Sequence, residues 1–130
     1  IPKPLQALAP PCSRILLVEN DAAVGQAMCS LLRTWHCDVF LAKDFAEAQA
    51  HLAGPPPDLL LLDYHLDGNR TGLDVRAQLG DAVKCIPTVV ITADRSDGVR
   101  DAVAEAGCFL LHKPLRPLAL KSLMSRILAR

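Results

Sequence analysis

The sequence predicts a doubly wound α/β domain, (βα)5 in chain order, with a five-stranded parallel sheet. From Arg14 onward, short apolar runs alternate with amphipathic stretches, a pattern typical of strands joined by crossover helices. Three runs contain only apolar residues, as expected for central strands that helices cover on both faces: Ile15–Val18, Leu59–Leu62 and Val89–Ile91. Two weaker runs, Val39–Leu41 and Phe109–Leu111, predict the outer strands.

Helical periodicity fills the stretches between these strands. An apolar stripe after the first strand predicts a core-facing helix, with the members Val24, Met28, Leu31, Leu32 and Trp35. Asp44, with Glu47 three residues later, marks the start of a second, shorter helix that ends near Gly54. A less regular pattern predicts a third helix through Leu73, Val75, Ala77 and Leu79.

Two further helices complete the pattern. Ser96 or Asp97 is expected to cap the fourth helix, which ends at Gly107. Pro117 lies where the first turn of the fifth helix tolerates a missing N–H. This last helix has the clearest apolar stripe, formed by Leu120, Leu123, Met124, Ile127 and Leu128.

Composition narrows the function classes. Apolar residues make up 51% of the 130 residues, enough for one buried core. Acidic and basic residues balance at 14 each without forming blocks, so we expect this domain to contact neither nucleic acid nor membrane. Five cysteines without C-x-x-C spacing argue against a zinc site and a complete disulfide framework, and favour a cytoplasmic location. The proline-rich start predicts a linker over residues 1–13 in a piece of a longer protein.

Polar residues follow the predicted strands at the ends where a parallel α/β sheet binds its ligands. Glu19–Asp21 follow the first strand, Asp63 the third, Thr92 the fourth and Lys113 the fifth. The acidic and amide oxygens suit a hard cation, while a carboxylate nucleophile, a hydroxyl and an ammonium suit a phosphoryl group. Alone, Asp63 would more simply be a turn residue and Lys113 a solvated charge. Their combination therefore carries the functional interpretation.

These motifs resemble those of response-regulator receiver domains, in the same order along the chain: Ile15–Asp21, Leu60–Asp63, Val89–Ala93 and Lys113–Pro114. The resemblance begins at about Arg14 and implies a flavodoxin-like receiver fold for residues 14–130. Three segments are more similar to receivers fused to the C-terminus of hybrid sensor histidine kinases: Asp63–Gly68, Thr71–Asp74 and His112–Leu115.

The resemblance implies that Asp63 takes a phosphoryl group from a phosphohistidine, and that the domain catalyses this transfer and its own dephosphorylation. Thr92 and Lys113 would contact phosphoryl oxygens, and the Lys113–Pro114 bond would be cis. Mg²⁺ is the implied cofactor, with the ligands Glu19 (through water), Asn20, Asp63 and the backbone carbonyl of His65. The implied partners are a histidine kinase core, in cis or in trans, and a histidine phosphotransfer domain. The parent protein would be a hybrid histidine kinase, other parts of which can be anchored in a membrane.

Two positions depart from the family pattern. Most receivers carry an acidic pair after the first strand, whereas the amide of Asn20 stands here, so we expect weaker Mg²⁺ binding. Asp21 is expected to cap the following helix more readily than to replace the missing ligand. Leu110 occupies a position that is usually aromatic, and Phe109, one place earlier, is expected on the opposite face of its strand.

Other functions stay open at this point. One is a pseudo-receiver, a protein-interaction module that is never phosphorylated, and Asn20 is its main support. Another is a free-standing response regulator with an output domain outside this sequence. A nucleotide or flavin binder is disfavoured because no glycine-rich phosphate loop follows the first strand, and Gly68–Gly72 is interpreted as a turn beside Asp63. We further hypothesise that His65 and Asp94, which would flank the phosphoryl group, set the lifetime of the acyl phosphate.

Overall fold

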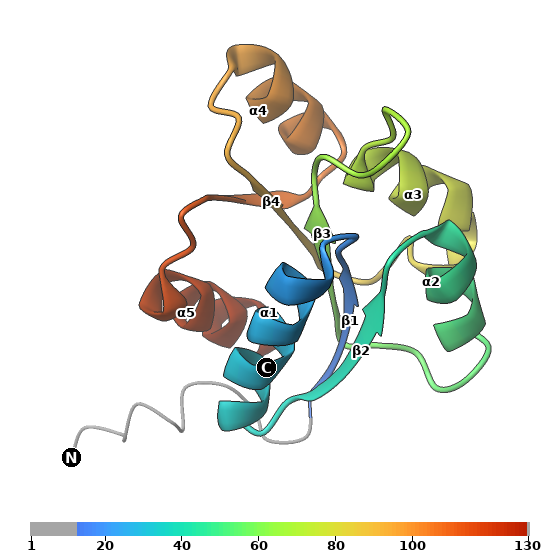
Figure 1. Cartoon of the computed structure of the whole chain (residues 1–130), viewed down its shortest axis with the longest axis vertical. Helices are drawn as coiled ribbons and strands as arrows, with labels where there is room; N and C mark the ends of the chain where they lie inside the picture. The colour runs from blue at the N-terminus through green and yellow to red at the C-terminus, as the bar shows by residue number, and fades with distance from the viewer. Residues whose placement is uncertain (1–12, 130) are drawn as a thin grey trace.

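The computed structural model describes residues 13–129 and confirms the predicted doubly wound parallel sheet (Figure 1). The strands are β1 (Arg14–Val18), β2 (Asp38–Ala42), β3 (Leu59–Asp63), β4 (Thr88–Thr92) and β5 (Phe109–His112). They pair in parallel in the order β2-β1-β3-β4-β5. Residues 1–12 of the predicted linker lie outside the described residues. Ser13 is buried, and its carbonyl accepts the N–H of Asp38 at 2.8 Å.

The five predicted helices are also present: α1 (Ala22–Thr34), α2 (Phe45–His51), α3 (Gly72–Leu79), α4 (Asp97–Glu105) and α5 (Pro117–Leu128). A single turn of 3-10 helix follows α3 at Gly80–Ala82. Side-chain oxygens cap the first four helices, and the capping residues are Asp21, Asp44, Thr71 and Ser96. Between residues 13 and 129, no helix has the length and apolar character needed to cross a membrane.

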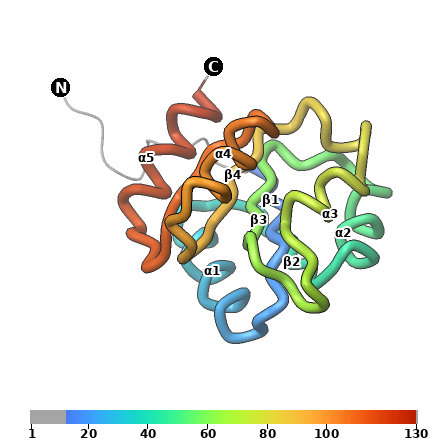
Figure 2. Tube along the Cα trace, turned by 90° about the horizontal axis from the view of Figure 1, so that it is seen from above, coloured from blue at the N-terminus to red at the C-terminus, as the bar shows by residue number. Residues whose placement is uncertain are grey.

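Helices cover both faces of the sheet in two separate apolar layers. Viewed from above, α1 and α5 lie on one side of the strands and α2 and α3 on the other (Figure 2). Alternate residues of β1 divide between the layers, with Leu17 packing in the α1/α5 layer and Leu16 in the other. Val99 and Val103 place α4 in the same layer as α2 and α3. Burial on both faces explains why the runs in β1, β3 and β4 are apolar throughout.

Strand β5 confirms the prediction that Phe109 and Leu110 lie on opposite faces of the strand. Leu110 packs in the layer of α2, α3 and α4, whereas Phe109 is 43% exposed. Successive side chains of a strand point to opposite faces, so an aromatic ring one place early cannot occupy the interior position that Leu110 fills.

A buried charge joins α1 to α5 at the end of α1 distant from Asp21. Trp35 follows the last residue of α1 and is buried among apolar residues. Lys121 of α5 is also buried, and its ammonium lies 5.4 Å from the centroid of the indole ring. An ammonium at this distance is attracted by the face of the ring, which offsets part of its loss of hydration.

Candidate functional site

The predicted site residues follow strands whose carboxyl ends lie at one edge of the sheet. Parallel pairing places Asp63 opposite Ile91 and Thr92 opposite His112. The ladder runs on beyond these pairs, as backbone N–H groups donate to carbonyls at 2.9 Å in Glu19–Ala42, Tyr64–Ile91 and Lys113–Thr92. The register of the sheet therefore fixes where each functional side chain leaves the backbone.

Asp63 and Lys113 form an ion pair at the centre of this edge. The Lys113 ammonium lies 3.1 Å from Asp63 Oδ1. Asp63 is only 8% exposed, while the Lys113 side chain keeps 37% of its surface exposed. The Lys113–Pro114 bond is cis, as the resemblance implied. An ammonium held in this position can interact with negative charge that arrives at the carboxylate.

Glu19 adds a second buried carboxyl beside Asp63. It is 5% exposed, and its Oε2 accepts the N–H of Asp21 at 3.2 Å. Burial raises the pKa of Glu19 above its ordinary value of 4.5, and the charge of Asp63 acts in the same direction. The N–H of Asp21 and the ammonium of Lys113 act in the opposite direction on this pKa but do not cancel the rise. Two carboxyls thus share one ammonium, so the site favours an additional cation.

Thr92 is buried and takes part in a chain of hydrogen bonds after β4. Its hydroxyl oxygen accepts the N–H of Asp94 at 3.0 Å, and Asp94 Oδ1 accepts the N–H of Ser96 at 2.9 Å. Hydrogen bonds from Ser96, reinforced by the charge of His65, hold the pKa of Asp94 below its ordinary value of 3.8. His65 Nε2 lies 3.7 Å from Asp94 Oδ2. The loops that follow β3 and β4 therefore contact each other beside Asp63.

A pocket of about 200 Å³ has Asp63 and Lys113 in its wall. Its other lining residues are Leu17, Glu19, Val24, Met28, Ile91, Pro114 and Leu115. The prediction that Val24 is a core residue was wrong, because this residue of the first turn of α1 lies at the pocket and is 37% exposed. Helical periodicity placed Val24 on the apolar stripe and could not distinguish sheet contact from pocket lining. The apolar surface beside Asp63 was thus missed.

Asn20 lines a different cleft, of about 510 Å³, on the side of α2. The remaining lining residues are Lys43, Asp44, Phe45, Ala46, Leu66, Asp67, Arg70 and Val75. Glu19 and Asp63 line the smaller pocket, and Asn20, the residue that follows Glu19, lines this larger cleft.

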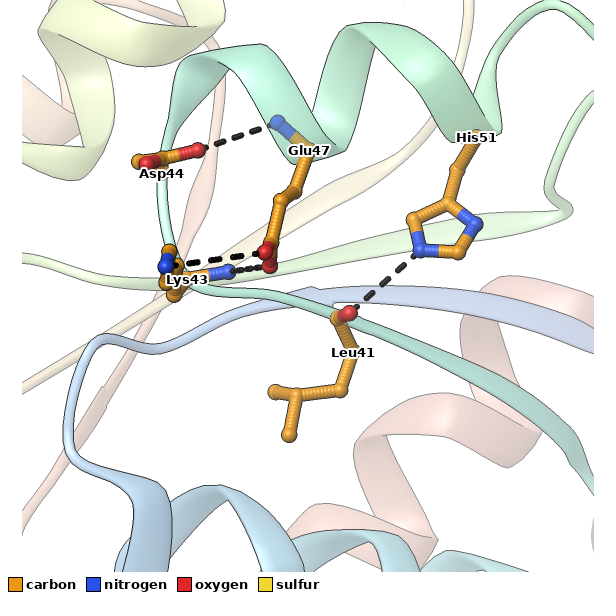
Figure 3. A network of polar contacts seen from close by, with 5 residues as sticks. All are labelled: Leu41, Lys43, Asp44, Glu47 and His51. Carbon is orange, nitrogen blue, oxygen red and sulfur yellow. Dashed lines mark hydrogen bonds and ion pairs between the residues drawn. The ribbon is translucent and has the colours of Figure 1, made fainter.

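A hydrogen-bond network holds the α2 side of this cleft (Figure 3). Asp44 Oδ1 accepts the N–H of Glu47 at 3.0 Å, and Glu47 Oε1 accepts the N–H of Lys43 at 2.9 Å. The Lys43 ammonium lies 3.9 Å from Glu47 Oε2, and His51 Nε2 lies 3.3 Å from the carbonyl oxygen of Leu41. Lys43 is thus engaged with α2, and Lys113 is the lysine that contacts Asp63.

Gly72 lets α3 begin directly against the end of β3. A Cβ atom at this position would lie 2.4 Å from the carbonyl oxygen of Asp63 and 2.9 Å from Leu62 Cβ, closer than a side chain can approach. The N–H of Gly72 also donates to the carbonyl of Tyr64 at 2.8 Å. Sequence reasoning interpreted this glycine as part of a turn. The structure shows instead that Gly72 is the first residue of α3. Glycine is needed there because only a residue without a side chain lets the helix start so close to the Asp63 carbonyl.

The oxygen atoms near Asp63 are of the chemical types that hard cations prefer as ligands. Mg²⁺ binds through one or two carboxylates and keeps several waters, and amide and carbonyl oxygens are also acceptable ligands for hard cations. Glu19 and Asp63 supply two carboxyls at this pocket. Among residues 13–129, no three His, Cys, Asp or Glu side chains gather into a metal-binding group. A cation here would therefore depend on water, on backbone carbonyls and on the amide of Asn20 for its other ligands.

Comparison with known protein families gives a match over most of the chain. The family model described as the response regulator receiver domain matches residues 15–125. A crystal structure of a two-component response regulator from Clostridium difficile superposes with a TM-score of 0.81, covering 91% of this chain and 97% of that chain at 23% identity. At this identity the likeness shows the fold alone.

Curated relatives extend the comparison. The chain is 33% identical over 119 residues to the phosphate regulon transcriptional regulatory protein PhoB of Klebsiella pneumoniae. It is 35% identical over 116 residues to the response regulator MprA of Mycobacterium avium. Both alignments cover 89% of this chain and 50% of the relative. The chain thus spans about half the length of the curated relatives it matches.

Substituting Gly72→Ala is expected to destabilise the domain by about 1–3 kcal/mol, because the new methyl group would overlap the Asp63 carbonyl. Gly98→Ala is the matched control, since open space surrounds that helical glycine, and we expect it to stabilise by about 0.5 kcal/mol. Urea denaturation measures both changes. Equal effects of the two substitutions would contradict the overlap expected between a Cβ atom at Gly72 and the Asp63 carbonyl.

The stability of Glu19→Gln relative to wild type is expected to rise with pH above 4.5. Below that pH the glutamate is protonated in both the folded and the unfolded state. Above it the unfolded chain loses its proton first, so wild type loses stability until the pH passes the raised folded pKa, and the glutamine variant escapes this loss. Denaturation in EDTA across a pH series measures the difference, with the exposed Glu105→Gln as control for the side-chain change. A difference that stays constant with pH would contradict the raised pKa.

Proposed function

Because this chain belongs to the response regulator receiver domain family, we propose that it acts in two-component signalling by taking a phosphoryl group from a phosphohistidine onto Asp63. The observation that carries the proposal is the 3.1 Å contact between Asp63 and the Lys113 ammonium, next to the buried carboxyl of Glu19. A carboxylate can act as a covalent nucleophile when fixed positive charge offsets the charge of the incoming group.

The proposed transfer needs three side chains of this domain. A carboxylate oxygen of Asp63 attacks phosphorus, the O–P bond forms as the P–N bond of the phosphohistidine breaks, and the electron pair stays on the imidazole nitrogen. The Lys113 ammonium donates to one phosphoryl oxygen and the Thr92 hydroxyl to another. The signal ends by hydrolysis of the acyl phosphate. Water attacks phosphorus, the Asp63 carboxylate leaves and inorganic phosphate is released. The domain thereby catalyses its own phosphorylation and dephosphorylation.

We assign Mg²⁺ as the cofactor of this transfer. The carboxylates of Glu19 and Asp63, the amide of Asn20 and the backbone carbonyl of His65 would hold it, directly or through water. When bound, the cation neutralises charge on the phosphoryl group in the transition state. The neutral amide of Asn20 in place of a carboxylate removes one negative charge from this set. We therefore expect affinity for Mg²⁺ below that of a site with three carboxylates.

The proposed phosphodonor is a histidine kinase core, in cis or in trans, and a histidine phosphotransfer domain is a further proposed partner. The apolar pocket lining beside Asp63, which includes Val24, Met28 and Leu115, offers a surface against which such a partner would present its histidine. We place the domain in the cytoplasm. That it binds neither nucleic acid nor membrane by itself stays a prediction.

The parent protein has two candidate forms. The similarity of Asp63–Gly68 and His112–Leu115 to receivers of hybrid histidine kinases supports a hybrid kinase. The names of the matched relatives, a transcriptional regulatory protein and a response regulator, support a response regulator with a further domain. The second form is also consistent with the chain covering half of those relatives.

A second candidate function is a pseudo-receiver that binds a partner without being phosphorylated. The observation that favours it is the neutral amide of Asn20, at a position where most receivers carry a carboxylate. The two functions differ in whether Asp63 ever carries phosphate.

Incubation with acetyl phosphate and Mg²⁺ is expected to add one phosphoryl group to wild type, because Asp63 is a preformed nucleophile beside Lys113. Intact-protein mass spectrometry measures the added group. Asp63→Asn should take none, whereas Asp101→Asn, which removes an exposed carboxyl of α4, should be modified like wild type. Absence of phosphate on wild type, or equal addition to Asp63→Asn, would favour the pseudo-receiver.

The lifetime of the acyl phosphate is expected to shorten by roughly threefold to tenfold when His65→Ala or Asp94→Ala removes the contact between the two loops, which corresponds to about 0.7–1.4 kcal/mol in the barrier. The physical reason is freer access of water to phosphorus once these side chains no longer face each other. Following the loss of phosphate over time by mass spectrometry measures the lifetime, with Asp101→Ala as a distant control. Unchanged lifetimes in both variants would remove this role for the pair.

A further inference from the structure

Helix α4 is attached to the domain by a narrow apolar stripe. Of its residues Asp97–Glu105, only Val99 and Val103 are buried. Two valines one turn apart hold a helix to the sheet but leave its rotation and its ends weakly determined. The polar contacts at the two ends of α4 therefore decide where the helix lies.

At its N-terminal end, α4 is connected to the site through a series of hydrogen bonds. Thr92 accepts from the backbone of Asp94, Asp94 accepts from the backbone of Ser96, and the Ser96 hydroxyl accepts the N–H of Val99 at 3.3 Å. This end of the helix thus follows the position of the residues at the carboxyl end of β4.

At its C-terminal end, α4 is held by a side chain from α3. Arg76 Nη1 donates to the carbonyl oxygen of Ala106, the residue that ends α4, at 3.4 Å. Arg76 Nε donates to the hydroxyl oxygen of Thr88, at the start of β4, at 3.2 Å. Thr88 is buried and donates in turn to the carbonyl of Ile86 at 3.1 Å. A guanidinium at a helix C-terminus satisfies carbonyl groups that have no partner within the helix, and its charge suits the negative end of the helix dipole.

The same helix that carries Arg76 is pressed against Asp63. Gly72 begins α3 where even a methyl group would meet the Asp63 carbonyl, and Arg76 lies one helical turn further along. A short helix moves as a unit, so a displacement of its first turn relative to β3 also displaces the guanidinium of Arg76.

We propose that Arg76 is a positioning residue that couples α3 to α4. When α3 shifts relative to Asp63, Arg76 shifts the C-terminal end of α4 with it. Through this residue and through Thr92, both ends of α4 are tied to residues at the site edge. Without Arg76, the C-terminal end of α4 loses its side-chain connection to α3 and to the start of β4. The inference concerns the unmodified protein and does not require that Asp63 be phosphorylated, so each of the two proposals can fail alone.

The test is a double-mutant cycle read by hydrogen exchange. The reporters are three backbone amides whose hydrogen bonds close the end of α4, those of Ala106, Gly107 and Cys108. Arg76→Ala is expected to speed their exchange by about threefold or more while amides of α1 and α5 keep their rates. Arg100→Ala is the matched control, because that exposed arginine of α4 pairs with Asp97 within the same helix, and it should leave the reporters unchanged.

Gly72→Ala supplies the displacement of α3. In the presence of Arg76 it is expected to speed exchange of the same three amides, and in the Arg76→Ala background it should add little. If Gly72→Ala does not fold, Thr71→Val, which removes the hydroxyl cap of α3, provides a milder displacement. Arg76→Lys should restore part of the protection, because an ammonium can still donate to the Ala106 carbonyl. Unchanged reporter exchange in Arg76→Ala, or equal effects of the α3 substitution in both backgrounds, would overturn the proposal.

Discussion

The placement of two acidic side chains against a single ammonium in a largely buried site is the constraint on which this domain depends. Glu19 and Asp63 are nearly inaccessible, and Lys113 is the lysine in contact with Asp63. The positions of all three are set by the backbone ladder of a parallel sheet, not by the side chains themselves. Removal of water makes the unbalanced negative charge unfavourable, and this is visible in the raised pKa of Glu19. The local imbalance is a physical reason for such a site to recruit cations.

Most of the architecture could be predicted from sequence because the signals were local. Uniformly apolar runs identified β1, β3 and β4, and the short polar residues Asp44 and Ser96 identified helix starts. The set of strand-end residues could be grouped because parallel strands end at one edge of a sheet. The reversal of Phe109 and Leu110 followed from the period of a strand alone. In each case the relevant interaction spans a few residues or follows from topology.

The features that escaped prediction depend on contacts between elements. Whether Val24 meets the sheet or a pocket depends on how α1 crosses the strands, which periodicity does not encode. That Asn20 lines the cleft on the α2 side likewise depends on how the loop after β1 folds over the sheet. The contact of Arg76 with the end of α4 depends on where α3 lies relative to α4, which the local sequence does not encode. Lys121 illustrates the same limit, since a lysine beside an apolar stripe ordinarily keeps its head in water.

The burial of Trp35 below Lys121 has a practical consequence for spectroscopy of this molecule. It is the single tryptophan of the sequence, so the intrinsic fluorescence of the domain comes chiefly from one indole in the α1/α5 layer. The 13 residues of α1 separate that indole from Asp21 by about 20 Å at 1.5 Å per residue. Its emission should therefore report on how α5 packs against α1. It should respond to the position of the Lys121 ammonium and be largely insensitive to changes around α4.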